Sequence, residues 1–239
     1  MPQTFFITGT DTGVGKTLVA CALIHAFKAR GLRVAGMKPV ASGSEPTAQG
    51  LRNHDALALQ QAADVVADYA TLNPYCFEPA IAPHLAARQA GVTIALATLR
   101  QTYQALAAQA EVVIVEGAGG WRVPLEPTGY LSDLPEAEGM AVILVVGLRL
   151  GCINHAVLSA EVINAGPCRL AGWVGNLIEP GFAPLQDNLQ TLQERLAAPC
   201  LGVLPHVASP DASVLSQYLN LSAMNLSNRV PHIAVIAAS

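Results

Sequence analysis

Lys16 and Thr17 stand side by side at the start of a helix-like stretch, directly after a glycine-rich segment that spans residues 8–15. The apolar run 5–7 predicts a strand before this segment, and residues 18–28 predict a helix after it. In such an arrangement, backbone N–H groups of the turn and of the helix N-terminus point at an anion. A lysine there brings charge to the outer phosphates of a nucleotide, and a threonine hydroxyl can bind Mg²⁺. The segment therefore predicts a phosphate-binding loop.

This loop departs from the general spacing at one position. The usual pattern has glycine six residues before the lysine, where this chain has Thr10, and the nearest glycine, Gly9, lies one residue earlier. The alternative interpretation is a glycine-rich turn with a solvated lysine. That alternative does not explain why Lys16 and Thr17 are adjacent at a helix start, so we interpret the segment as a functional loop.

A carboxylate followed by small residues ends another apolar run. Residues 112–115 predict a buried strand that continues into Glu116 and then into Gly117, Ala118 and Gly119. In nucleotide-binding sheets an acid at this place holds or orients Mg²⁺, and small residues let the backbone approach a phosphate. A solvated glutamate at a strand end is the alternative, and the phosphate-binding loop earlier in the chain argues against it.

Two further charged residues follow or precede predicted elements. Lys38 follows the predicted strand 33–37, where a lysine beside a phosphate site can neutralise charge on a transferred phosphoryl group. Alone, it is more typical of a surface lysine.

Asp55 precedes the helical run 56–61, and its spacing favours a helix cap by Asp55 or Asn53 over a second Mg²⁺ carboxylate. A cap also faces the ligand edge, so both interpretations are compatible.

Two later segments are also placed to meet a ligand. Gly151 and Asn154 fit a helix N-terminus, which attracts anions, and we interpret His155 as a helix-start residue and not as a base. Asn176 ends a predicted strand, where its amide can offer a donor and an acceptor to the edge of a base. A turn asparagine is the alternative.

Composition limits the classes of protein that fit this chain. The 239 residues are 52% hydrophobic and 13% charged, which suits one large α/β domain with strands buried on both faces. A net charge of −4 argues against a general nucleic-acid binder. The longest apolar run, 140–146, is far below the ~18 residues that span a bilayer. The start of the chain lacks a basic leader, which argues against a signal peptide. The five cysteines lack a CxxC pair, which predicts reduced thiols in the cytoplasm.

Strand and helix patterns alternate along the chain. They predict a three-layer, doubly wound and mostly parallel sheet flanked by helices, with ligands at the carboxyl ends of the strands. We expect one domain over 1–222, with 223–239 as an extension that is either a last strand or loosely attached. Segments 41–50 and 124–135 are expected to be loops. The predicted strands are 5–8, 33–37, 112–115, 142–146, 170–174 and 201–204, and the predicted helices are 18–29, 56–63, 94–108, 156–164 and 185–196.

Taken in order, these motifs resemble those of the dethiobiotin synthetases, a family of the P-loop NTPase superfamily. The resemblance runs from Thr4 to about Leu221. Many ATPases share a phosphate-binding loop, whereas segments 38–43 (Lys-Pro-Val-Ala-Ser-Gly) and 151–155 (Gly-Cys-Ile-Asn-His) are much more specific. The other matching segments are 8–12, 14–17, 51–53 with Asp55, 73–75, 115–120 and 171–174 with Asn176.

The resemblance implies an ATP- and Mg²⁺-dependent cyclo-ligase of biotin biosynthesis. Its substrate, 7,8-diaminononanoate, reacts with CO₂ to give a carbamate, whose oxygen attacks the γ-phosphate of ATP. The resulting carbamic–phosphoric anhydride is closed to a ring by the second amine, which expels phosphate. Because two anions meet in the middle step, positive charge is the main requirement.

The resemblance also assigns roles to matching residues. Lys16 and Lys38 would supply charge, and Thr17, Asp55 and Glu116 would hold the metal. Ser42 and Gly119 would contact the diamine, and Gly151, Cys152, Ile153 and Asn154 would receive the distal carboxylate across a homodimer interface. The expected nucleotide contacts are Thr12, Gly13, Val14, Gly15, Lys16, Thr17, Leu18, Asp55, Glu116, Gly117, Ala118 and Gly119, with Asn176, Pro205, His206 and Val207 at the adenine.

Three positions depart from the family pattern. Gly13 replaces a residue that is often acidic, Leu177 stands where an acid is common, and Asn188 lies about where a tyrosine reaches the partner's substrate. One alternative is an amidotransferase-like ligase of the cobyrinic acid diamide synthase type, which would need a glutaminase Cys-His arrangement. A switch resembling the partitioning or septum-placing ATPases is another. Those carry a lysine early in the loop, where this chain has Asp11 and Gly13.

Overall fold

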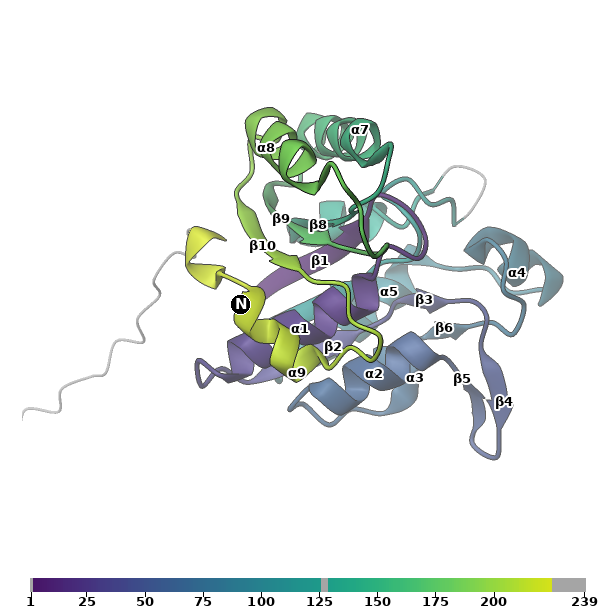
Figure 1. Ribbon diagram of the computed structural model, residues 1–239. Coiled ribbons are helices and arrows are strands. Elements are labelled where there is room, and N and C mark those ends of the chain that lie inside the picture. The colour runs from purple at the N-terminus through teal and green to yellow at the C-terminus, as the bar shows by residue number, and fades with distance from the viewer. Residues whose placement is uncertain (1, 126–128, 225–239) are drawn as a thin grey trace, which may run out of the picture.

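The computed structural model describes residues 2–125 and 129–224. Its centre is a six-stranded sheet in the order β10-β9-β8-β1-β7-β2, and every strand pair in it is parallel (Figure 1). The predicted parallel α/β fold is therefore confirmed, and all six predicted strands are present. Their bounds are Gln3–Gly9 (β1), Val34–Met37 (β2), Val112–Glu116 (β7), Ala141–Gly147 (β8), Leu170–Asn176 (β9) and Cys200–Leu204 (β10).

Alternate residues of the central strands enter two separate cores. In β1, Phe5 and Ile7 pack on one face of the sheet, while Phe6 packs on the other. Both faces of a parallel strand are buried because crossover helices cover both sides. This burial explains why the strands read as continuous apolar runs without a polar alternate.

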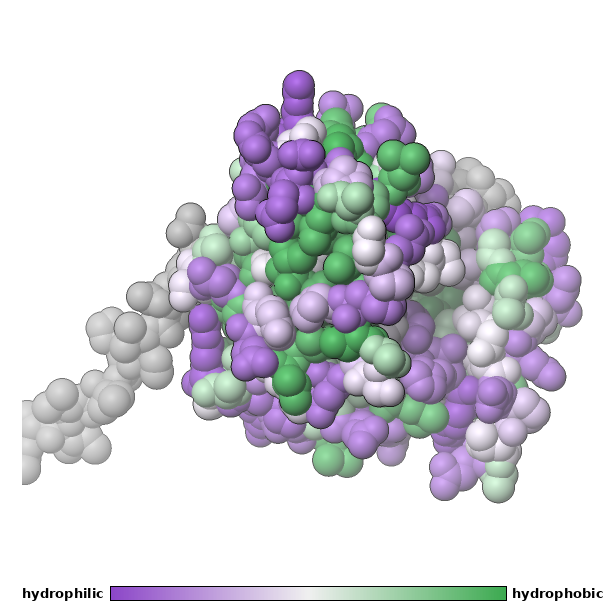
Figure 2. All heavy atoms as spheres, viewed as in Figure 1, coloured by the Kyte–Doolittle hydropathy of each residue, from purple (hydrophilic) through white to green (hydrophobic). Residues whose placement is uncertain are grey.

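Helices cover each face of the sheet and complete the three layers (Figure 1). One face carries α1 (Lys16–Lys28), α2 (His54–Ala62) and α9 (Ala212–Leu215). The other carries α5 (Leu96–Ala107), α6 (Asp133–Glu138), α7 (Cys152–Ala165) and α8 (Leu185–Arg195). Figure 2 shows mostly hydrophilic side chains on the outer surface of α8, whose buried residue Leu192 joins the core.

Several short elements were not expected. Segment 41–50 is not a plain loop, because β4 (Glu45–Thr47) pairs antiparallel with β5 (Gly50–Arg52). Their side chains are exposed or half-buried, so no apolar alternation signals the hairpin. Within the expected loop 124–135, α6 already begins at Asp133. The other additions are β3 (Val40–Ala41), which pairs with β6 (Tyr75–Cys76), the helices α3 (Tyr69–Leu72) and α4 (Pro83–Gln89), and the 3₁₀ turns Ser216–Tyr218 and Leu221–Met224.

The end of the described chain packs on the core. Leu221 and Met224 are each 1% exposed and join the apolar cluster that faces α1. Core contacts thus continue two residues past the expected boundary at 222, and the remaining part of the expected extension, 225–239, lies outside the described residues. No helix in the described part of the chain combines the length and apolarity needed to cross a membrane. All five cysteines are free thiols.

Candidate active site

The loop between β1 and α1 has the backbone that phosphate binding requires. Gly13 and Gly15 have φ angles of 76° and 89°, in the left-handed region that favours glycine. At Gly15, which caps the N-terminus of α1, an added Cβ would lie 2.2 Å from Asn176 Nδ2. No other residue fits there, and the free N-terminus of α1 is left facing the cleft described below.

Lys16 is the first residue of α1 and is 8% exposed. Its Nζ donates a 3.0 Å hydrogen bond to the carbonyl of Asp11, so the side chain folds back along the loop. Burial, reinforced by the nearby charge of Lys38, lowers the pKa of Lys16 to about 8. The ammonium therefore sits in a place that lacks a full counter-charge and is suited to an anionic ligand.

Three charged side chains from separate segments meet beside this loop. Lys38 Nζ donates to Glu116 Oε1 at 2.6 Å, to Asp55 Oδ2 at 2.9 Å and to the Gly117 carbonyl at 3.3 Å. The sheet order explains the meeting, because β7 lies between β1 and β2 and pairs Met37 with Val115. The next residue of each strand segment, Lys38 and Glu116, therefore emerges at the same carboxyl edge.

Asp55 reaches this cluster because another residue caps its helix. The Asn53 side chain accepts hydrogen bonds from the backbone N–H groups of Asp55 and Ala56. Of the two candidate caps, Asn53 is the one used. The carboxylate of Asp55 is thereby free to contact Lys38 from the first turn of α2.

Lys38 is held in its charged form. Its side chain is 4% exposed, and burial alone would lower the pKa of an ammonium. The adjacent Glu116 and Asp55 outweigh that effect and raise the pKa of Lys38 above its usual value. The buried ammonium therefore keeps its proton at neutral pH.

The same cluster offers oxygen ligands of the kind that Mg²⁺ prefers. Thr17 donates its hydroxyl to Glu116 Oε1 at 2.9 Å, and Glu116 Oε2 is buried without a hydrogen-bond partner among the described residues. The described residues contain no group of three or more His, Cys, Asp or Glu that could hold a metal by itself. One or two carboxylates completed by ligand phosphates are what Mg²⁺ usually takes, so the residues fit that ion together with a nucleotide.

These groups line a cleft of about 810 Å³. Its walls also include the segment from Ala80 to Pro83, together with Arg122, Val123 and Pro124. The sequence patterns missed Arg122, whose guanidinium donates to Ser132 and Glu136, because a lone arginine in a presumed loop carries no motif. The predicted site residues that line the cleft are Thr12, Gly13, Gly15, Lys16, Thr17, Lys38, Ser42, Asp55, Glu116, Ala118 and Gly119.

Comparison with known proteins assigns the chain to a family. The family described as "AAA domain" matches residues 3–213. An ATP-dependent dethiobiotin synthetase of Pseudomonas paraeruginosa is 52% identical over 223 residues, which cover 93% of this chain and 98% of that protein. Another, from Xanthomonas euvesicatoria, is 51% identical over 217 residues, 91% of this chain and 97% of that protein. The chain belongs to the dethiobiotin synthetase family.

Solved structures agree with the fold. The septum site-determining protein MinD of Pyrococcus horikoshii, complexed with Mg-ADP, has a TM-score of 0.58 at 14% identity, covering 93% of this chain and 89% of that chain. A ParA family ATPase of Chlorobium tepidum has a TM-score of 0.57 at 11% identity, covering 95% of this chain and 100% of that chain. At these identities the likeness shows the P-loop NTPase fold alone.

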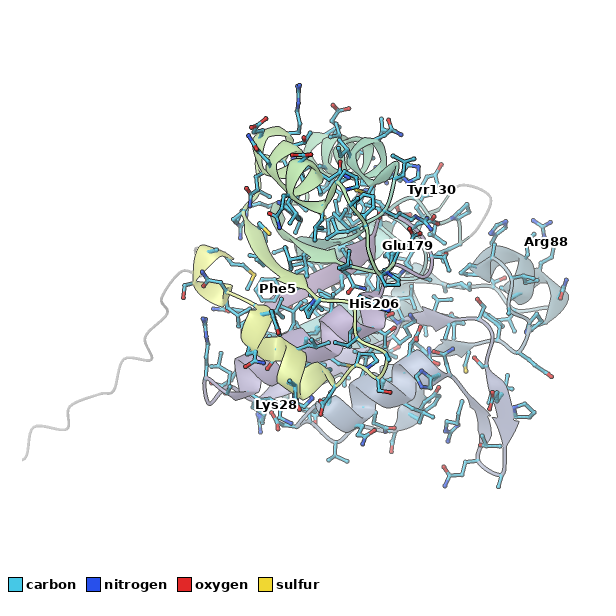
Figure 3. All side chains as sticks on the ribbon, in the orientation of Figure 1. Phe5, Lys28, Arg88, Tyr130, Glu179 and His206 are labelled. Carbon is cyan, nitrogen blue, oxygen red and sulfur yellow. The ribbon has the colours of Figure 1, made fainter. Side chains whose placement is uncertain are left out.

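The residues expected at the adenine in this family lie at one end of β9 and β10. Asn176 pairs with Leu204, so the segment from Pro205 begins beside Asn176. Figure 3 labels His206, after β10, and Glu179, after β9, at this end of the two strands. The Asn176 Nδ2 donates to the Val14 carbonyl at 2.9 Å, which ties β9 to the phosphate-binding loop. Leu177 donates its N–H to Leu204 and packs against the core.

The expected carboxylate site of this family does not line the cleft of one chain. Gly151, with φ of 90°, caps α7, and Asn154 is exposed. Cys152 is 3% exposed in the core, and its N–H donates to the Arg149 carbonyl. Neither the thiol nor the N–H of Cys152 is therefore free for a ligand. Arg149 in turn pairs with Asp11 at 2.7 Å and links the start of α7 to the phosphate-binding loop.

Two further expected nucleotide contacts are used inside the fold. The N–H of Gly117 donates to the Ile7 carbonyl at 2.9 Å as part of the sheet edge, so it is unavailable to a nucleotide. Val14 is 1% exposed, and only its neighbours on the loop face the cleft. Ala118 and Gly119, by contrast, both line the cleft.

Proposed function

We propose that the chain is an ATP-dependent dethiobiotin synthetase, which converts 7,8-diaminononanoate, CO₂ and ATP to dethiobiotin, ADP and phosphate. The observation that carries this proposal is Lys38, a buried and charged ammonium that lines the same cleft as the phosphate-binding loop and Ser42. A lysine in that place suits a reaction in which two anions must meet. The near full-length match to relatives of that name supports it.

The proposed steps are those that the family resemblance implies. One amine of the substrate adds to CO₂ and loses a proton, which gives a carbamate. A carbamate oxygen then attacks the γ-phosphorus, and the bond to the ADP oxygen breaks. The second amine attacks the carbonyl carbon of the resulting carbamic–phosphoric anhydride and loses a proton, and phosphate leaves with the former carbamate oxygen. Lys16 and Lys38 would neutralise charge in the second step, where preorganised cations lower the barrier most.

The expected site residues divide between nucleotide, metal and diamine. Thr12 to Lys16 would wrap the phosphates, while Thr17, Asp55 and Glu116 would hold Mg²⁺, which supplies further positive charge when bound. Ser42 and Gly119 would lie against the diamine, with Ala118 beside them. Asn176 and the segment from Pro205 to Val207 would flank the adenine. The Oδ1 of Asn176 would accept from the base amino group, because its Nδ2 already donates to Val14.

A homodimer in the cytoplasm is the form we propose for the enzyme. Gly151 to Asn154 lie outside the cleft of their own chain, which supports a role for a second copy in bringing a helix N-terminus to the substrate's carboxylate. Fixing both ends of a long flexible substrate lowers the entropy cost of ring closure. We also propose that the described residues up to Met224 form a single domain.

Purified protein given ATP, Mg²⁺ and bicarbonate tests the activity. Phosphate release that requires the diamine is the expected result. Release that ignores the diamine and rises with DNA or lipid would instead favour a partitioning-type switch and would overturn the proposal.

Glu116 is the buried carboxylate that we expect to bind Mg²⁺. Glu116→Ala is expected to raise the Mg²⁺ concentration for half-maximal turnover by at least about tenfold, since it removes a buried oxygen ligand. Glu111→Ala is the matched control, because Glu111 precedes the other end of β7 and accepts from the Arg33 N–H. A Mg²⁺ titration of Glu116→Ala that matches the parent protein would remove Glu116 from the metal site.

The pKa of Lys16 predicts a pH dependence for nucleotide binding. Because that pKa is about 8 in the free protein, Lys16 is mostly protonated below pH 8 and mostly neutral above it. Bound triphosphate favours the charged form, so ATP binding at pH 8 should take up protons, and affinity should fall above that pH by up to about tenfold per unit. Calorimetry in buffers of different ionisation enthalpy measures the uptake. Its absence, or uptake by Lys16→Ala, would contradict the assignment.

A further inference from the structure

Tyr69 and Asn73 form a polar path, a short series of hydrogen bonds, between the segments that carry Lys38 and Asp55. Asn73 is 2% exposed, and Tyr69, one turn earlier on α3, is half-buried. The Tyr69 hydroxyl donates to Asn73 Oδ1 at 3.1 Å. Neither residue lines the cleft, so neither is expected to touch a ligand.

One end of this path holds the backbone of Lys38. Asn73 Nδ2 donates to the Lys38 carbonyl at 2.7 Å and to the Tyr75 carbonyl at 3.1 Å. The Lys38 N–H donates to the Leu72 carbonyl at 2.9 Å, so both polar groups of the Lys38 main chain are bound by the end of α3. The base of the lysine side chain is therefore fixed by this segment.

The other end holds the start of α2. The N–H of Asn53, the residue before α2, donates to the Tyr69 hydroxyl at 2.7 Å. This hydrogen bond is shorter than the 3.1 Å bond from the same hydroxyl to Asn73. Asn53 is the residue whose side chain caps α2 and receives the Asp55 N–H. The main chain that carries Asp55 is thus connected to the main chain that carries Lys38 by four successive hydrogen bonds.

Lys38 and Asp55 are also joined directly through their side chains, because Lys38 Nζ donates to Asp55 Oδ2. We propose that Tyr69 and Asn73 are positioning residues, which set the separation of Lys38 and Asp55 and so keep both charges in place for phosphoryl transfer. This inference rests on the proposed function for its catalytic consequence. Its structural part, the tether of α2 to Lys38, does not depend on that function.

Asp55 needs such a tether more than Glu116 does. Glu116 is 1% exposed on a central strand, whereas 38% of the Asp55 side chain faces solvent. An exposed carboxylate gains little from an ion pair and can turn to water instead. Tyr69 is itself held by the Arg52 guanidinium, 4.1 Å from the ring centroid, and burial raises its pKa to about 12, so the hydroxyl remains a donor.

Tyr69→Phe tests the tether, with Tyr103→Phe as the matched control. Tyr103 is 7% exposed and also bonds through its hydroxyl, to Thr4 Oγ1 at 2.8 Å, but it packs beside the opposite end of β1. The two variants should lose similar stability. Only Tyr69→Phe should speed hydrogen exchange of the amides of residues 53–56, read by mass spectrometry. Unchanged exchange there would overturn the tether, even if the protein had another activity.

The catalytic consequence is tested in the same variants and in Asp55→Asn. Tyr69→Phe is expected to lower diamine-dependent kcat by about tenfold and to change the KM for ATP by less than about threefold. In the Asp55→Asn background the same change should have little further effect, because the tether acts through that carboxylate. An equal loss in both backgrounds, or normal turnover by Tyr69→Phe, would overturn the inference. A parent protein that releases no phosphate with the diamine would overturn the proposed function alone.

Discussion

Lys38→Ala is expected to lower turnover by more than about tenfold at saturating diamine, because it removes the ammonium that neutralises the reacting anions. It should also lower stability. Glu116, 1% exposed, would lose its 2.6 Å partner, and an unpaired buried carboxylate typically costs about 3–5 kcal/mol. Kinetics and thermal melting measure the two effects separately.

A second substitution tests whether the stability loss comes from the unpaired carboxylate of Glu116. Lys38→Ala combined with Glu116→Gln should recover part of the melting temperature, because the amide carries no charge to desolvate. Turnover should stay low. Normal turnover by the single variant at saturating diamine would remove Lys38 from the reaction.

Lys16→Ala should also lose more than tenfold in turnover, about the scale for one preorganised electrostatic contact, with weaker ATP binding. Unlike Lys38→Ala, the Lys16→Ala variant should not lose stability. The folded-state pKa of about 8 lies below the usual 10.5, so the charged form is penalised in the folded protein, and that penalty is complete below pH 8. At pH 7 the alanine variant should therefore melt no lower than the parent protein.

Lys28→Ala is the matched control on the same helix. Lys28 lies at the other end of α1, where it pairs with Asp64 at 3.0 Å in a partly exposed ion pair of small net value. Its loss should leave turnover unchanged. If Lys16→Ala bound ATP as tightly as Lys28→Ala does, the phosphate-binding role of Lys16 would be wrong.

Arg122 shows what motif analysis misses at the cleft. It contributes a third cation to the walls beside Lys16 and Lys38, but it comes from an irregular segment and is partly neutralised by Glu136. Its place depends on how that segment folds over the end of β7. Short-range sequence patterns carry no information of that kind.

The amino-acid sequence by itself determined the six strands, the phosphate-binding loop and the family. Strands buried on both faces must be continuous apolar runs, and a turn with Gly13 and Gly15 at positive φ leaves few other residues possible. These are local requirements, so they can be read along the chain.

Only the tertiary structure decided which charges meet. The sheet inserts β7 between β1 and β2, and this places Glu116 against Lys38, 78 residues earlier in the chain. It also decided that Asn53 caps α2 and leaves Asp55 free, and that Tyr69 and Asn73 join the two segments. Hydrogen bonds between distant segments depend on strand order and packing, which no spacing along the sequence encodes.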